Sequence, residues 1–307
     1  MRHSAVGGGM SRLGADSLLL ITAVLWGVTF VAQKYATATM PALAFVAARF
    51  AVSAAALAPF ALWEFRRKPH TPSRDEWRLA LVIGLALFFG TTLQQAGIET
   101  TSATNAGFLT ACYVVLTPFV VWVLAGVRPR RIIVGAGFIS LVGAWLLASG
   151  GALGPPNVGD ALVLLADFAW ATVIALTPIF LARSGRPLLL AFVQYAVCAG
   201  LAGLCSALVE SVPPGALVAT APTILFAGIV SGAIAYTIQI FAQAHTPPAE
   251  AALILALEGV FAALAGALLL SERLTATGAF GCVLILAGAL AAEIGPLFGR
   301  RRARGAT

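Results

Sequence analysis

The stretch DSLLLITAVLWGVTFVAQKYATA (residues 16–38) is the type of sequence that decides this fold. Its only charged residues are Asp16 at the start and Lys34 near the end. The hydrocarbon core of a bilayer is about 30 Å thick, and a helix of about 20 mainly apolar residues crosses it. The stretch therefore predicts a membrane-spanning helix.

Similar runs recur along the whole chain, separated by charges, prolines or glycines. We predict ten membrane-spanning helices, near residues 16–38, 41–63, 76–98, 102–125, 131–150, 157–181, 187–210, 218–243, 247–270 and 275–297. The composition agrees, because 60% of the 307 residues are hydrophobic and only 10% are charged. About a quarter of the residues of a soluble domain are charged. The expected fold class is an all-α membrane protein, and a conventional soluble enzyme is excluded.

The positions of Lys and Arg predict the orientation of the chain. If the N-terminus is cytoplasmic, 16 of the 19 Lys and Arg residues lie in cytoplasmic segments, and the exceptions are Lys34, Arg49 and Arg273. Membrane proteins carry an excess of these residues on the cytoplasmic side. We expect both termini in the cytoplasm, with tails at 1–15 and 298–307. The net charge of +7 is then a topology signal rather than a sign of nucleic-acid binding.

The chain resembles itself at an offset of about 145 residues. Asp16 and Trp26 line up with Asp160 and Trp170. Because each half would hold five helices, an odd number, the second half would cross the membrane in the opposite sense. In transporters, such inverted repeats place the substrate site near the midplane, between the halves. We expect two repeats, at residues 16–150 and 157–297.

The end of each half carries a recognisable pattern. Residues 102–124 are SATNAGFLTACYVVLTPFVVWVL, and residues 248–293 are PAEAALILALEGVFAALAGALLLSERLTATGAFGCVLILAGALAAE. Both resemble the EamA repeat of the drug/metabolite transporter superfamily, over about residues 16–297. The chain is most similar to the YddG-type exporters of aromatic amino acids. The resemblance implies a multi-pass transporter of the bacterial inner membrane that needs no cofactor and exports small metabolites by alternating access.

Trp26 and Trp170 are the first candidates for a substrate site. Each lies about ten residues into its predicted helix, which is about 15 Å and half the depth of the hydrocarbon core. Their matching positions predict that they face each other. Two indoles beside a cavity suit an aromatic or amphipathic substrate, through stacking and cation–π attraction. Alternatively, both side chains face lipid or pack in the core.

Ionisable side chains at this depth are costly, so each is a candidate for function. Asp167 precedes Trp170 by three residues, and Glu258 lies at similar depth in the ninth predicted span. Either acid could hold a proton, bind a substrate ammonium group, or simply join helices by hydrogen bonds. Arg49 could pair with one of these acids or bind a substrate carboxylate.

Further polar and aromatic side chains could complete the cavity or make helix–helix hydrogen bonds. They are Gln94, Tyr113, Tyr236 and Gln239. Pro118 and Pro178 each remove one backbone hydrogen bond from a predicted span. We therefore expect hinges at these two prolines.

An enzyme finds little support in the sequence. It contains no HExxH motif and no phosphate-binding glycine loop. The four cysteines lie in apolar spans without a CxxC pair, so neither a disulfide framework nor a metal site is expected. The predicted partners are a small-molecule substrate and the lipid bilayer, with no nucleic acid and no obligate protein partner. Open alternatives are a passive facilitator or channel, an exporter of other metabolites or cationic drugs, a lipid flippase and an assembly scaffold.

Overall fold

The computed structural model describes residues 10–149, 158–271, 273 and 275–304. Within these ranges every regular element is a helix, so the predicted all-α fold class is confirmed. Residues 1–9 of the predicted N-terminal tail lie outside the described residues, as does the junction between the predicted repeats at 150–157.

Short connections join the helices, one of which is a π-helix of 11 residues, η1. In chain order they are α1 (Arg12–Ala36), α2 (Ala42–Arg67), α3 (Arg74–Thr100), α4 (Ala103–Thr110), α5 (Tyr113–Ala125), α6 (Arg131–Ser149), α7 (Val158–Ser184), α8 (Pro187–Val209), α9 (Ala216–Leu225), η1 (Phe226–Tyr236), α10 (Thr237–Gln243), α11 (Pro248–Leu255), α12 (Glu258–Leu269) and α13 (Ala276–Arg304).

Eight segments of the described chain are long and apolar enough to cross a membrane. Five are the single helices α1, α2, α3, α7 and α8, and three are the joined helices α4–α5, α9–η1–α10 and α11–α12. Shorter apolar stretches, Arg131–Leu147 in α6 and Ala276–Ala291 in α13, coincide with the other two predicted spans. Large apolar side chains such as Phe60, Phe138 and Phe280 are exposed on the outside, as a lipid-facing surface requires. The chain is a multi-pass membrane protein.

Two spans break at positions that correspond under the offset of about 145 residues. Residues 111–112 separate α4 from α5, and residues 256–257 separate α11 from α12. Several backbone N–H groups at these breaks bond to carbonyls three residues earlier instead of four. Such tight turns often mark a functional hinge inside a helix. Tyr113 and Glu258 are the first residues after the two breaks.

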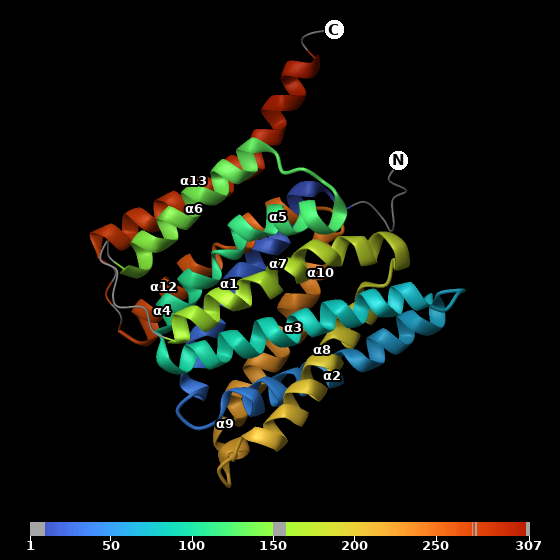
Figure 1. The fold of residues 1–307 in the computed structure, drawn as a ribbon, viewed down its shortest axis with the longest axis vertical. Helices are drawn as coiled ribbons and strands as arrows, with labels where there is room; N and C mark the ends of the chain where they lie inside the picture. The colour runs from blue at the N-terminus through green and yellow to red at the C-terminus, as the bar shows by residue number, and fades with distance from the viewer. Residues whose placement is uncertain (1–9, 150–157, 272, 274, 305–307) are drawn as a thin grey trace.

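Three long pairs of helices frame the molecule (Figure 1). α6 packs along α13 at one end, α2 packs along α8 at the other, and α3 packs along α7. Glycines lie at the contact between α6 and α13. A Cβ on Gly143 would lie 2.6 Å from the carbonyl oxygen of Gly281, so the two helices approach too closely for a side chain. Between these pairs, α1 contacts η1, α10, α11 and α12. This central group of helices surrounds the candidate site.

Candidate functional site

A cavity lies among the central helices, and its lining comes from α1, α2, α3, α4, α5, α7, η1, α10 and α12. The lining residues are Trp26, Thr29, Phe30, Gln33, Arg49, Gln94, Thr110, Tyr113, Trp170, Ile174, Ser231, Tyr236, Gln239 and Glu258. Seven of the eight substrate-binding candidates from the sequence are among them, and Asp167 is the exception.

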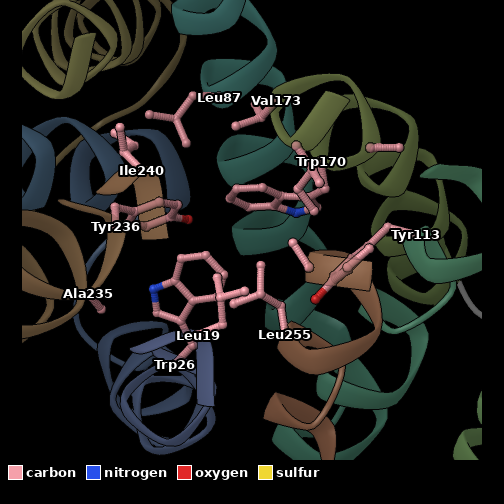
Figure 2. Close-up of a cluster of buried hydrophobic side chains, with 14 of the residues drawn as sticks. Leu19, Trp26, Leu87, Tyr113, Trp170, Val173, Ala235, Tyr236, Ile240 and Leu255 are labelled. Atoms are coloured by element: carbon pink, nitrogen blue, oxygen red, sulfur yellow. The ribbon is translucent and has the colours of Figure 1, made fainter. Parts of the chain in front are cut away.

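Three aromatic side chains form one cluster at the cavity (Figure 2). The ring centroids of Trp26 and Trp170 are 6.4 Å apart, and Tyr236 lies 4.4 Å from the first and 6.0 Å from the second. The rings of Trp170 and Tyr236 are stacked, with an interplanar angle of 20°. A flat ring inserted between two others needs about 7 Å, two van der Waals contacts of about 3.5 Å each. An aromatic substrate would therefore have to displace at least one of these side chains.

The π-helix η1 is held by side chains from three neighbouring helices. The Trp26 Nε1 donates a hydrogen bond to the carbonyl of Ser231, at 3.3 Å. Ser53 of α2 and Tyr195 of α8 donate to other η1 carbonyls, at 2.7 Å and 3.1 Å. Regular π-helix is rare and is frequently found at functional sites. These bonds orient the Trp26 indole against Tyr236, the last residue of η1.

Arg49 brings a positive charge to the cavity. Its side chain is 4% exposed, and its guanidinium lies over the rings of Phe45 and Phe50, 5.6 Å and 4.9 Å from their centroids. It forms no ion pair with the described residues, and its Nε has no hydrogen-bond partner among them. A guanidinium stays protonated in proteins. The cavity therefore carries a positive charge that no carboxylate in the described part of the chain neutralises by an ion pair.

Glu258 supplies the carboxyl group of the cavity. Its side chain is 3% exposed, and its Oε1 has no hydrogen-bond partner among the described residues. Tyr113, the equivalent residue after the other helix break, lies within electrostatic range of it. The cavity thus contains a buried cation and a buried carboxyl group that are not paired with each other.

The remaining polar candidates are tied to their neighbours. The Gln94 Nε2 donates to the Thr110 hydroxyl at 2.9 Å, and the Gln239 Nε2 donates to the Gln243 side-chain oxygen at 3.2 Å. These bonds fix both amides at the cavity wall. The polar wall, the unpaired charges and the aromatic cluster are suited to binding a small molecule with charged and apolar parts.

A model of the EamA-like transporter family matches residues 13–149 and, a second time, residues 157–292. The chain belongs to the EamA-like transporter family. An "uncharacterized transporter" from Archaeoglobus fulgidus is 34% identical over 284 residues, covering 91% of this chain and 85% of that protein. A crystal structure of another protein, 20% identical, superposes with a TM-score of 0.74 over 95% of this chain and 99% of that one. That last similarity concerns the fold alone.

Membership in this family makes the chain a transmembrane transporter with a small-molecule substrate, and it confirms the family resemblance of the sequence. A transporter of this family is not a typical enzyme. The aromatic amino-acid subtype is a narrower prediction and belongs to the proposed function.

Asp167 of this EamA-like transporter lies outside the cavity lining. Three residues along an α-helix turn the side-chain direction by about 300°, so Asp167 and Trp170 diverge by about 60°. Trp170 points into the aromatic cluster, whereas Asp167 lies within electrostatic range of Cys112 and Glu258.

Several lining residues were not singled out from the sequence. Thr29, Phe30 and Gln33 follow Trp26 by three, four and seven residues, so the periodicity of one helix face could have identified them. Thr110 and Ser231 lie next to a helix break and inside the π-helix, where a regular helical periodicity no longer predicts direction.

The two predicted hinge prolines lie inside continuous helices. α5 continues through Pro118, and α7 continues through Pro178. The irregular backbone nearest to the cavity lies instead at residues 111–112, at residues 256–257 and in η1. Hinge motion at the prolines stays a prediction.

Proposed function

We propose that this transporter exports small zwitterionic metabolites, and aromatic amino acids in particular, across the bacterial inner membrane. The observation that carries this proposal is the cavity that combines the unpaired Arg49, the Glu258 carboxyl group and the aromatic cluster of Trp26, Trp170 and Tyr236. An aromatic amino acid has a carboxylate, an ammonium group and a ring. Each of these three groups has a complementary side chain in the cavity.

The chemistry of each contact is ordinary. A guanidinium binds a carboxylate through two parallel hydrogen bonds, and such charge-assisted bonds are about twice as strong as neutral ones. The substrate ammonium group would bind Glu258 and the faces of the neighbouring aromatic rings. The substrate ring would stack within the aromatic cluster, which distinguishes aromatic from aliphatic amino acids.

Alternating access between two inverted five-helix repeats, at residues 16–150 and 157–297, is the mechanism that we propose. The two separate family matches support it. The packing supports it too, because the pairs α2–α8 and α6–α13 join helices that correspond under the repeat. This arrangement implies ten membrane spans with both termini on one side of the membrane, and the positions of Lys and Arg predict that this side is the cytoplasm. The repeats would rock around the cavity, with hinges at Pro118 and Pro178.

Arg49 also bears on the choice between substrate classes. A cationic drug would be attracted by Glu258 and the aromatic rings but repelled by the unpaired guanidinium. A zwitterion uses both charges, and for this reason we favour it. A passive facilitator would share the same lining and differs only in kinetics.

Uptake of labelled phenylalanine and tryptophan into liposomes containing the purified protein tests the proposal. We expect saturable uptake that unlabelled substrate on the other side accelerates, and much weaker uptake of alanine. Trp26→Ala, Trp170→Ala, Arg49→Gln and Glu258→Gln should each reduce it, whereas the exposed control Phe138→Ala should not. Uptake without saturation or trans-stimulation would indicate a channel. No aromatic uptake by well-folded protein would refute the substrate assignment.

A further inference from the structure

Asp167 is a buried carboxyl group that lies outside the transport cavity. Its side chain in α7 is 0% exposed, and neither Oδ1 nor Oδ2 has a hydrogen-bond partner among the described residues. An ionised carboxylate without a donor or a cation is very costly in such surroundings. In this conformation the side chain is therefore accommodated as the neutral acid, which holds a proton.

Ionisable groups near Asp167 also lie at the cavity. Glu258 on α12 and Tyr113 on α5 lie within its electrostatic range, as does the thiol of Cys112 at the break between α4 and α5. Glu258 and Tyr113 also line the cavity, and each has an oxygen without a hydrogen-bond partner in the described chain. Two oxygen atoms without hydrogen-bond partners in the described chain, those of Glu258 and Tyr113, therefore lie near Asp167 at the cavity wall.

Packing does not require a carboxyl group at this position. The offset that aligns Trp26 with Trp170 places Ala23 opposite Asp167, and Ala23 is also fully buried. The first half of the chain therefore fills the corresponding site with a methyl group. An ionisable residue in only one half is more readily explained by function than by packing.

We propose that Asp167 binds the proton whose inward movement drives the export of substrate. This inference rests on the proposed function, because it assigns the substrate ammonium group to Glu258. The substrate ammonium group at Glu258 favours an ionised Asp167 nearby, so substrate binding releases the Asp167 proton to cavity water. After the substrate leaves on the opposite side, Asp167 takes up a proton from that side. One proton then moves inward for each substrate that moves outward.

The test separates coupling from transport itself. Liposomes containing the full-length protein receive an interior about one pH unit more acidic than the bath, with the membrane potential clamped at zero. With one proton exchanged per substrate, this gradient supports at most about tenfold accumulation of labelled phenylalanine. The wild type should approach this limit. Asp167→Asn should lose the accumulation and retain exchange of labelled for unlabelled phenylalanine across the membrane without a gradient.

Two further variants complete the design. Asp167→Ala introduces the residue that the first half has at the corresponding position, Ala23, and should behave like Asp167→Asn. Agreement between the two variants would show that the loss of accumulation is not a folding defect of one of them. Asp75→Asn removes an exposed carboxylate that pairs with Arg78 and should accumulate substrate like the wild type. Gradient-driven accumulation by Asp167→Asn would overturn the proposal, as would a wild type that exchanges substrate but does not respond to the gradient.

A substrate-independent measurement distinguishes failure of this proposal from failure of the proposed function. If the wild type exchanges no aromatic amino acid, the substrate assignment fails. The infrared carbonyl band of a protonated carboxylic acid, present in the wild type and absent from Asp167→Asn, still reports the proton site. Absence of this band from the difference spectrum at neutral pH would overturn the proposal.

Discussion

The hydroxyl of Thr246 donates a hydrogen bond to the Oδ1 of Asp16, at 2.8 Å, and joins the start of α1 to the residues before α11. The same bond exists between Thr101 and Asp160, also at 2.8 Å, at the start of α7. These two pairs occupy corresponding positions in the two halves of the sequence. Arg12 reinforces the first pair by ion pairs with Asp16 and Glu250.

We expect these two pairs to act as latches at opposite ends of the cavity. A hydrogen bond to a charged group contributes about 1.5–3 kcal/mol, so its loss should raise opening at that end roughly tenfold or more. Thr29→Cys in a cysteine-free background provides a cavity thiol for a membrane-impermeant reagent. Thr246→Val should accelerate its labelling from one side of the membrane, and Thr101→Val from the other. Equal effects of both variants on one side would contradict the latch assignment.

A second reciprocal relationship concerns stability. The Glu64 carboxylate at the end of α2 accepts the backbone N–H of Leu189 at the start of α8, and Glu210 after α8 accepts those of Leu43 and Ala44 in α2. Helix N-terminal caps contribute about 1 kcal/mol each. Glu64→Gln and Glu210→Gln should therefore lower the apparent Tm in detergent. Glu99→Gln, at an exposed position, should leave it unchanged.

The glycine contact between α6 and α13 should tolerate no side chain. A Cβ on Gly143 would lie 2.6 Å from one backbone oxygen, whereas a Cβ on Gly135 of the same helix would meet nothing within 4 Å. Gly143→Ala should destabilise the protein by separating the helices. Gly135→Ala should stabilise it slightly, by up to about 1 kcal/mol from helix propensity. Thermal unfolding of both variants checks this, and equal effects would show that the contact is loose.

The two central tryptophans should respond differently to loss of the indole N–H. The Trp170 Nε1 is buried without a partner in the described chain, whereas the Trp26 Nε1 bonds to η1. If the substrate carboxylate uses the free donor, Trp170→Phe should raise KM about fivefold to 150-fold, the effect of about 1–3 kcal/mol, with little change in Tm. Trp26→Phe should instead lower Tm. Transport kinetics and thermal unfolding of the two variants together decide this, and an unchanged KM for Trp170→Phe would exclude the contact.

Pro118→Ala tests the proposed hinge. Restoring a backbone N–H at this position permits a hydrogen bond to the carbonyl of Val114 and stiffens α5. We expect slower transport with an unchanged amount of protein in the membrane. Pro59→Ala, in the exposed part of α2, is the matched control and should transport normally. A normal rate for Pro118→Ala would remove this proline from the mechanism.

The sequence by itself determined the fold class and much of the cavity. Apolar length and charge placement predict membrane helices, because a bilayer admits few charges and no unpaired backbone groups. The matching positions of Trp26 and Trp170 predicted that they meet, and their centroids are 6.4 Å apart. Position along a helix measures depth in the membrane, and depth was sufficient to select these two residues.

Only the tertiary structure decided which polar groups share the cavity. Asp167 and Glu258 lie at similar depth, but helix rotation and the break before Glu258 direct only the latter into the lining. The contribution of Ser231 depends on the π-helix, whose wider turn changes the direction of each following side chain. Arg49 has no carboxylate partner among the described residues because of how α2 packs, not because of any local pattern. Depth follows from local sequence, whereas direction depends on packing between distant helices.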